Sequence, residues 1–153
     1  MSSSVLRISE AASLAMHATS LLAGQGGRRL STAQMAGVLG ASEATLSKVM
    51  QRLGRAGLVE SVRGPRGGFV LAAAPAAITL MDVYRAVEGT PPEARCLLGK
   101  PVCDGGRCIL GGMIETVNRQ VRDYFEKVTL AELAGSFSLP ESETNREQKH
   151  RQD

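Results

Sequence analysis

The sequence contains no tryptophan, and aromatic residues make up only 3% of its 153 residues. Leu, Val, Ile, Met and Ala must therefore build any core, for which a hydrophobic share of 43% is sufficient. No apolar run approaches the roughly 18 residues that a membrane-spanning helix needs. The stretch 1–24 also lacks the continuous apolar segment of a secretory signal, because Glu10, Ser13 and His17 interrupt it. We therefore expect a cytoplasmic protein without a membrane partner, built from one domain or one domain with an appendage.

Cysteine is scarce and confined to one place. Cys96, Cys103 and Cys108 all fall within CLLGKPVCDGGRC, and there are no others. In a reducing cytoplasm, clustered thiols bind metal or take part in redox chemistry more often than they form structural disulfides. An odd number also leaves one thiol unpaired in any disulfide scheme. The segment is therefore a candidate metal or redox site.

Patterns of enzyme chemistry are missing as well. No Ser/His/Asp set, paired-carboxylate pattern or nucleotide-binding loop stands out, so the sequence does not favour an enzyme.

The charge of the chain is unevenly distributed between its two halves. Residues 1–75 carry eight Lys/Arg against three Glu, a net charge of +5, and residues 76–153 carry ten against twelve acidic residues, a net charge of −2. A basic first half is typical of a protein that binds a polyanion there.

Two short amphipathic segments predict a helix-turn-helix. Ser31 or Thr32 can cap the first helix and Gly40 can end it, and Ser42 can cap the second. The second helix has apolar residues at i, i+3, i+4 and i+7, which are Leu46, Val49, Met50 and Leu53. A two-residue connection with a glycine at the break favours a helix-turn-helix, although another helical hairpin would show the same spacing.

A β-hairpin is predicted directly after the second helix. LVESV and FVLA are typical of strands, and RGPRGG between them is typical of a turn. Helix-turn-helix followed by hairpin is the order of a winged helix. The hairpin tip carries Arg63, Gly64 and Arg66, and such a tip can approach a phosphate backbone and place arginines in a groove. The predicted fold class is mainly α with a small β-wing.

The second half predicts helices of a different kind. Thr79 and Asp82 fit a capping box for a helix that Gly89 ends, and TPPEAR is a linker. A long helix is expected over CILGGMIETVNRQVRDYFEKV. Its apolar residues recur with the 3.5-residue period of a coiled coil, which favours a dimer seam over a core-facing helix. They are Leu110, Ile114, Val117, Val121, Tyr124 and Val128.

Four segments follow from these patterns. We expect a winged helix-turn-helix domain over residues 5–89 and a cysteine loop over 90–108. A dimerisation helix and a C-terminal helix follow over 109–135. Residues 136–153 are polar and unpatterned from Pro140 onward, which predicts a disordered tail.

With these motifs in place, the sequence resembles the IscR/NsrR-like bacterial transcription regulators, the Rrf-two family. The resemblance covers about residues 5–135 and is most specific in GLVESVRGPRGGFVLA followed by ITLMDVYRAVEG. The cysteine loop, the long helix and VTLAEL also fall where this family places its cluster and its dimerisation helix. The resemblance implies a dimeric winged-helix DNA-binding protein. In many members an iron–sulfur cluster senses iron, nitric oxide or redox state.

The resemblance also implies that the three cysteines hold an iron–sulfur cluster, with 2Fe–2S favoured over 4Fe–4S, since thiolates suit such clusters. The fourth ligand must then come from elsewhere. In relatives it is a histidine that would match Gly111, or an aspartate on the first helix that would match Ser13, and neither residue is a suitable ligand. In others it is a histidine one turn further along that helix, which matches His17. We expect His17 to complete the set, from the same or the other subunit.

Other interpretations of these residues remain open. Three cysteines and His17 would also make a common zinc set, although the spacing lacks a C-x2-C pair. The cysteines could instead form a thiol–disulfide switch without metal. His17 lies on a polar stripe with Glu10, Ser13 and Ser20 of a helix capped by Ser9, where a solvated histidine is ordinary. A small iron–sulfur electron carrier or a protein-interaction adaptor are rival functions, and neither explains the arginine-bearing wing as well as DNA binding does.

The recognition helix is expected over residues 42–54. Hydroxyls near its start can meet base edges or phosphates, and cations further along can neutralise phosphates. The resemblance implies that Arg63 reaches into a minor groove. Candidate contacts are Ser42, Thr45, Ser47, Lys48, Arg52, Arg63, Gly64 and Arg66. A dimer would read a near-palindromic operator in double-stranded DNA, with half-sites about 34 Å apart or a multiple of that.

Overall fold

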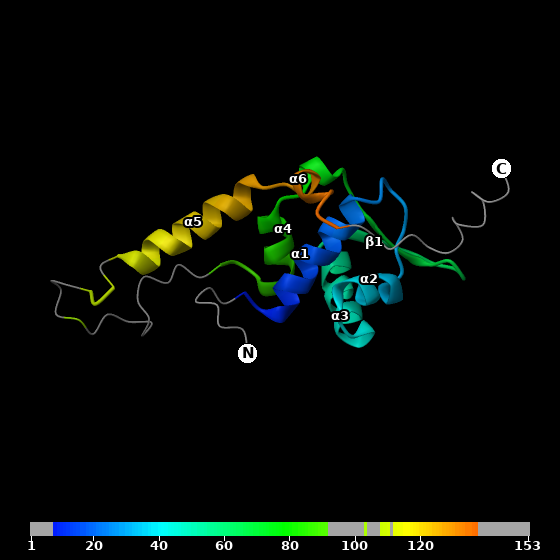
Figure 1. Ribbon diagram of the computed structural model, residues 1–153, viewed down its shortest axis with the longest axis horizontal. Coiled ribbons are helices and arrows are strands. Elements are labelled where there is room, and N and C mark those ends of the chain that lie inside the picture. Colours follow the sequence, from blue (N-terminus) through cyan, green and yellow to red (C-terminus); the bar gives the residue numbers. More distant parts are fainter. Residues whose placement is uncertain (1–7, 92–102, 104–107, 111, 138–153) are drawn as a thin grey trace, which may run out of the picture.

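The computed structural model describes residues 8–91, 103, 108–110 and 112–137. Its elements are α1 (Glu10–Ala23), α2 (Thr32–Leu39), α3 (Glu43–Arg55), β1 (Val59–Val62), β2 (Gly68–Leu71), the 3-10 helix η1 (Pro75–Ala77), α4 (Leu80–Glu88), α5 (Met113–Lys127) and α6 (Leu130–Leu133). Helices α1–α4 and α6 and the β1–β2 hairpin form one body, and α5 projects from it on the side opposite the hairpin (Figure 1). The predicted mainly helical fold with a small β-wing is confirmed.

The predicted starts of α1, α2, α3 and α4 are confirmed, because each has a side chain that caps it. The hydroxyl of Ser9 accepts a hydrogen bond from the Ala12 N–H at 3.0 Å. Ser31, rather than Thr32, caps α2, and Gln34 completes a capping box by accepting from the Ser31 N–H at 2.9 Å. Such bonds satisfy N–H groups that have no partner within the helix. The ends of these helices are therefore fixed by contacts local in sequence.

Helix α1 lies at the centre of the body, against α2, α3, α4 and α6. Its buried apolar residues are mostly alanines, which let neighbouring helices approach closely. The prediction that Ser20 belongs to a polar stripe with Glu10 and Ser13 is wrong, since Ser20 is only 5% exposed. Its hydroxyl donates to the Met16 carbonyl at 2.7 Å, so it can be buried without an unpaired group.

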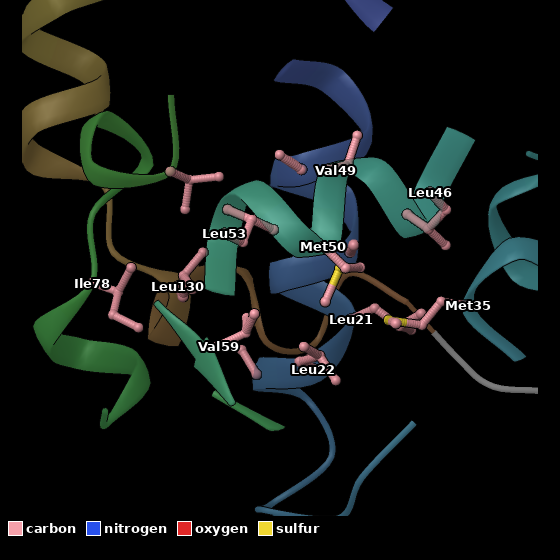
Figure 2. Close-up of a cluster of buried hydrophobic side chains, with 14 of the residues drawn as sticks. Leu21, Leu22, Met35, Leu46, Val49, Met50, Leu53, Val59, Ile78 and Leu130 are labelled. Carbon is pink, nitrogen blue, oxygen red and sulfur yellow. The ribbon is translucent and has the colours of Figure 1, made fainter. Parts of the chain in front are cut away.

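The predicted helix-turn-helix core is confirmed. Leu46, Val49, Met50 and Leu53 of α3 are all buried. In Figure 2, Met50 lies near Leu21 of α1, Leu46 lies toward Met35 of α2, and Leu53 lies toward Leu130 of α6. Gly40 ends α2 in the left-handed conformation, with a φ of 62°. That conformation costs a glycine little, and it turns the chain sharply into α3.

The wing is a β-hairpin with an additional short pairing. Strand β1 pairs antiparallel with β2 from Val59 opposite Leu71 to Val62 opposite Gly68. Leu30 forms a further bridge with Phe69, through N–H···O bonds of 3.1 and 2.8 Å. A Cβ on Gly68 would lie 2.4 Å from the Leu30 carbonyl oxygen, so this approach requires glycine. The wing is thereby tied to the segment that leads into α2.

Helix α5 is shorter at its start than predicted. The prediction of a helix from Cys108 is wrong, because residues 108–110 are not helical and α5 begins after Gly112, whose φ is 82°. Most of the predicted linker, and Cys96, lie outside the described residues. At the other end of the chain, Phe137 packs against the core, and residues 138–153 of the predicted tail lie outside the described residues.

Candidate functional site

The start of α3 presents an ordered pair of hydroxyl groups. Ser42 is exposed; its hydroxyl accepts from the Thr45 N–H at 3.1 Å and donates to the Thr45 hydroxyl at 2.8 Å. The Thr45 hydroxyl therefore keeps its own proton for an outside acceptor. Ser47, one turn into the helix, is half-buried. The predicted polar residues thus lie together at the exposed N-terminal end of the helix-turn-helix.

The cations of α3 do not all have the same surroundings. Lys48 and Arg55 are exposed. Arg52 is also exposed, but its Nη1 donates to the Val87 carbonyl at 3.4 Å, near the C-terminal end of α4. A cation there interacts favourably with the helix dipole. Arg52 is among the DNA contacts predicted from the sequence and Arg55 is not. The direction of Arg52 toward α4 has no local signal in the sequence.

The hairpin tip is shaped by its glycines. Arg63, Gly64 and Arg66 are exposed, and the Gly67 N–H donates to the Gly64 carbonyl at 2.8 Å. The φ of Gly64 is 116°, a conformation that side-chain-bearing residues rarely adopt. A Cβ on Gly67 would lie 2.7 Å from the Val62 oxygen. The tip therefore exposes two arginines on a narrow turn.

The α3 and wing segments together are basic. Residues 42–66 contain five Lys/Arg and two Glu, a net charge of +3, and all seven side chains are exposed. Figure 1 shows the hairpin extending past α2 and α3, away from α5. A positively charged, exposed helix beside a protruding hairpin is suited to a polyanionic double helix.

His17 is exposed on α1, and its ring is held in one orientation. Nδ1 lies 2.6 Å from the Ser13 carbonyl oxygen, and the ring meets Phe137 edge-on at 5.6 Å between centroids. A carbonyl can only accept, so Nδ1 donates this bond, and in the neutral ring Nε2 is then the nitrogen with the lone pair. Histidine ligands of metals are commonly oriented by such a bond on the other ring nitrogen.

Cys103 and Cys108 are free and exposed, whereas Cys96 lies outside the described residues. The Cys108 sulfur accepts a hydrogen bond from the Leu110 N–H at 3.5 Å. In the sequence, Cys108 comes shortly before Met113, the first residue of α5, and that end of α5 is the one farther from the body (Figure 1). No cluster of three or more His, Cys, Asp or Glu side chains able to hold a metal occurs among the residues that the structure describes. Within the described part of one chain, His17, Cys103 and Cys108 therefore do not form a three-ligand group.

The apolar face of α5 is only partly covered in the chain. Met113, Val117 and Tyr124 are 51%, 39% and 55% exposed, whereas Phe125 is buried. Of the predicted seam, Leu110 and Val128 lie just outside the helix, and Ile114 and Val121 are half-buried. Phe125 is not part of the predicted seam, and it is the residue that packs α5 against Tyr84 of α4, with 5.8 Å between ring centroids. None of the helices in the described part of the chain is long and apolar enough to cross a membrane.

The sequence is similar to a family of known regulators. A family model described as Rrf2, iron-dependent transcriptional regulator, matches residues 8–136. The HTH-type transcriptional regulator IscR of Erwinia tasmaniensis is 37% identical over 101 residues, which are 65% of this chain and 61% of that protein. IscR of Yersinia enterocolitica is 35% identical over 103 residues, or 67% of this chain and 62% of the relative. The chain thus spans about three fifths of the length of these curated relatives.

Solved structures resemble the fold over most of the chain. The structure of CymR, described as the global cysteine regulator of B. subtilis, has a TM-score of 0.70 and 27% identity, and covers 88% of this chain and 100% of that one. IscR of T. potens has a TM-score of 0.63 and 26% identity, over 84% of this chain and 86% of that one. These names agree with the expectation of a regulator rather than an enzyme.

Proposed function

The chain belongs to the Rrf2 family of transcriptional regulators, and from that premise we propose that it is a homodimeric DNA-binding regulator controlled by an iron–sulfur cluster. The observation that carries the proposal is the arrangement of two surfaces on one chain. A basic, exposed helix and wing form the first surface, and the free, exposed thiols of Cys103 and Cys108 form the second. The first surface suits DNA and the second suits a soft metal centre.

DNA binding rests on the exposed start of α3 and the hairpin tip. Ser42, Thr45 and Ser47 would meet base edges or phosphates, because α3 presents them at its N-terminal end. Lys48 would neutralise phosphate. Arg63, Gly64 and Arg66 would follow the backbone into the adjacent groove, where a narrow turn lets arginines enter. Arg52 would contribute less, since its guanidinium already donates to the Val87 carbonyl. The operator is a near-palindrome in double-stranded DNA.

Dimerisation rests on the uncovered face of α5. Val117, Val121 and Tyr124 recur at the spacing of a coiled-coil seam, and none of them is covered by the body as fully as Phe125 is. An exposed apolar stripe on a projecting helix marks an interaction site. A second copy of the same helix supplies a surface of matching chemistry. The two-fold axis of such a pair agrees with a palindromic operator.

The candidate ligand residues fit an iron–sulfur cluster shared between two subunits rather than a metal site formed within one chain. Cys103 and Cys108 are unpaired thiols, and the N–H···S bond at Cys108 is of the kind that stabilises sulfur bearing negative charge. The His17 ring is already turned so that Nε2 is the free ligand atom. We propose that Cys96, Cys103 and Cys108 hold the cluster with His17 of the partner subunit, since His17 and the two described thiols do not form a metal-binding group within the described part of one chain. Bound there, a cluster supplies iron whose oxidation state and ligation respond to redox state, nitric oxide or iron supply.

Coupling to DNA follows from the position of α1. This helix carries His17 on its exposed side and packs its buried side against α3. If His17 served as a ligand, any displacement of its side chain would act on the helix that packs against α3. Because packed interiors resist deformation, a shift of α1 is passed to α3 rather than absorbed between them. Ligation of His17 would therefore bias the orientation of the recognition helix.

The test is a visible absorption spectrum with iron and sulfide analysis on protein purified without oxygen. We expect a coloured protein with about equal iron and sulfide, bleached by Cys103→Ala and by His17→Ala. His150→Ala is the matched control, because it removes the other histidine of the chain and should leave the colour unchanged. A colourless protein that cannot be reconstituted with iron and sulfide would contradict the cluster. Stoichiometric zinc in that protein would favour the zinc site, and reversible disulfide formation would favour a thiol switch.

A further inference from the structure

Two similar segments meet where α5 returns to the body. ITLMD at 78–82 and VTLAE at 128–132 share a β-branched residue, threonine, leucine and, two positions later, a carboxylate. Each begins a helix, α4 in one case and α6 in the other. The two threonines, Thr79 and Thr129, form an isolated antiparallel β-bridge. We call this contact the Thr79–Thr129 junction.

Each segment of the junction completes the backbone hydrogen bonding of the other. The Leu80 N–H donates to the Val128 carbonyl at 3.0 Å, and the Leu130 N–H donates to the Ile78 carbonyl at 2.9 Å. Leu80 and Leu130 are the first residues of their helices, so these N–H groups have no acceptor within the helix. Either helix start would be left with an unpaired N–H if the two segments separated. The pairing is therefore specific in register as well as in position.

Carboxylates hold both threonines in the extended conformation that pairing needs. The Thr79 N–H donates to the Asp82 Oδ2 at 2.9 Å, and the Thr129 N–H donates to the Glu132 Oε2 at 2.7 Å. The two threonines have nearly equal backbone angles, with φ of −93° and −97° and ψ of 162° and 160°. Leu130 is fully buried beneath the junction. The junction is thus a packed, hydrogen-bonded joint and not a passing contact between loops.

The rest of α5 is attached to the body much more weakly. Phe125 is its only buried residue, and α4 is its main neighbour. The ion pair between Arg85 and Glu126 has an N···O distance of 3.8 Å between half-exposed side chains, so it contributes little. The direction in which α5 leaves the body is therefore set at its C-terminal end, by Phe125 and by the junction one turn later.

A small change at that end is magnified along the helix. Helix α5 has 15 residues, so it is about 22 Å long, and a tilt of about 10° displaces its outer end by about 4 Å. The rise of one base pair is about 3.4 Å. If two copies of α5 pair, the angle between α5 and the body fixes how far apart the two recognition helices lie. We propose that the Thr79–Thr129 junction sets this separation and so selects the spacing between operator half-sites, an inference that rests on the proposed dimeric DNA-binding function.

The test compares two double variants, each of which lacks a different capping box. The variant Thr129→Ala/Glu132→Ala removes the box in the junction, and Ser31→Ala/Gln34→Ala removes the box of α2, which lies within the body. Wild-type protein is first used to select a duplex from a random-sequence pool. Affinities are then measured for that duplex and for versions with one base pair added or removed at its centre. We expect wild-type protein to discriminate between spacings, and the junction variant to lose about fivefold of that discrimination.

The possible results distinguish a failure of this inference from a failure of the proposed DNA-binding function. The α2 variant should lower affinity for all spacings alike, and Thr129→Ser/Glu132→Gln, which restores a capping box, should recover wild-type selectivity. A junction variant that folds, dimerises and keeps wild-type spacing selectivity overturns the inference alone. Should that double variant fail to fold, Glu132→Ala alone takes its place, with the same expected direction. A wild-type protein that selects no duplex, or that is monomeric, overturns the proposed function and the inference with it.

Discussion

The body and α5 are stabilised in opposite ways. The body buries apolar side chains from every one of its α-helices, and capping side chains satisfy the starts of α1, α2, α3 and α4. Helix α5 contributes Phe125 alone to the buried apolar residues that the structure describes, and no side chain caps its start at Gly112. The core of the body is thus formed within one chain, whereas the apolar face of α5 stays partly exposed.

Because of this difference, the body and α5 are suited to different functions. A region that is complete in one chain can present a fixed surface to DNA, since its geometry does not depend on a partner. A helix with an uncovered apolar face gains stability only by burying it against another surface. Substitutions in the body should therefore affect folding first, and substitutions on α5 should affect assembly first.

The largest effect should come from the centre of the body. Leu46→Ala leaves a cavity in the core beside α3, because Leu46 is fully buried. We expect it to lower the free energy of unfolding by about 2–5 kcal/mol. Urea denaturation followed by circular dichroism measures this loss. Val117→Ala, on α5, should change the unfolding of the body little; a loss as large as that of Leu46→Ala would contradict the division between the regions.

The second-largest effect should come from a charge on the apolar face of α5. Val117→Asp places a charge on the exposed stripe of α5, where a dimer seam would bury it. We expect the dimer dissociation constant to rise by about a hundredfold while the helix content of the body is unchanged. Sedimentation and circular dichroism measure the two quantities. Arg119→Gln changes the charge of the helix by the same amount away from the stripe, and should leave the dimer intact.

The same division decides what the sequence can predict. The caps at Ser9, Ser31, Ser42 and Thr79 are recognisable because each depends on a residue three positions away. The apolar spacing of α3 likewise predicts its buried face. These signals are local, so they are present in the sequence without knowledge of the fold. They account for the element order and for the winged helix.

Features that join distant segments are not predictable in this way. The Leu30–Phe69 bridge and the Thr79–Thr129 junction depend on where separate elements meet. The same is true of Ser20, which has the composition of a polar stripe but is buried. The direction of Arg52 toward Val87 is a further case. His17 and the cysteines remain a prediction, because their meeting would involve a second chain that no single-chain pattern describes.

A third prediction concerns the contact between the wing and the body. Gly68→Ala would place a Cβ 2.4 Å from the Leu30 carbonyl oxygen, which is backbone and cannot move aside freely. We expect a loss of about 1–3 kcal/mol in the free energy of unfolding, and weaker DNA binding because the wing is displaced. Gly37→Ala is the control: no atom lies within 4 Å of its added Cβ, and it lies in the interior of α2. It should stabilise the protein by about 0.5–1 kcal/mol. A neutral Gly68→Ala would show that the wing is not held by that bridge.

The smallest effect should come from the one ion pair between the regions that the described residues show. Arg85 and Glu126 join α4 to α5, but the side chains are 51% and 48% exposed and their N···O distance is 3.8 Å. Water and salt screen such a pair, so Arg85→Ala should lower the free energy of unfolding by less than about 0.5 kcal/mol. It should also leave the half-site spacing selectivity unchanged, since α5 is held by Phe125 and the junction. Denaturation at low and high salt, with the spacing assay beside it, measures both. A loss above about 1 kcal/mol at low salt, or an altered spacing preference, would show that surface charge directs α5 and that the hydrogen-bonded junction does not act alone.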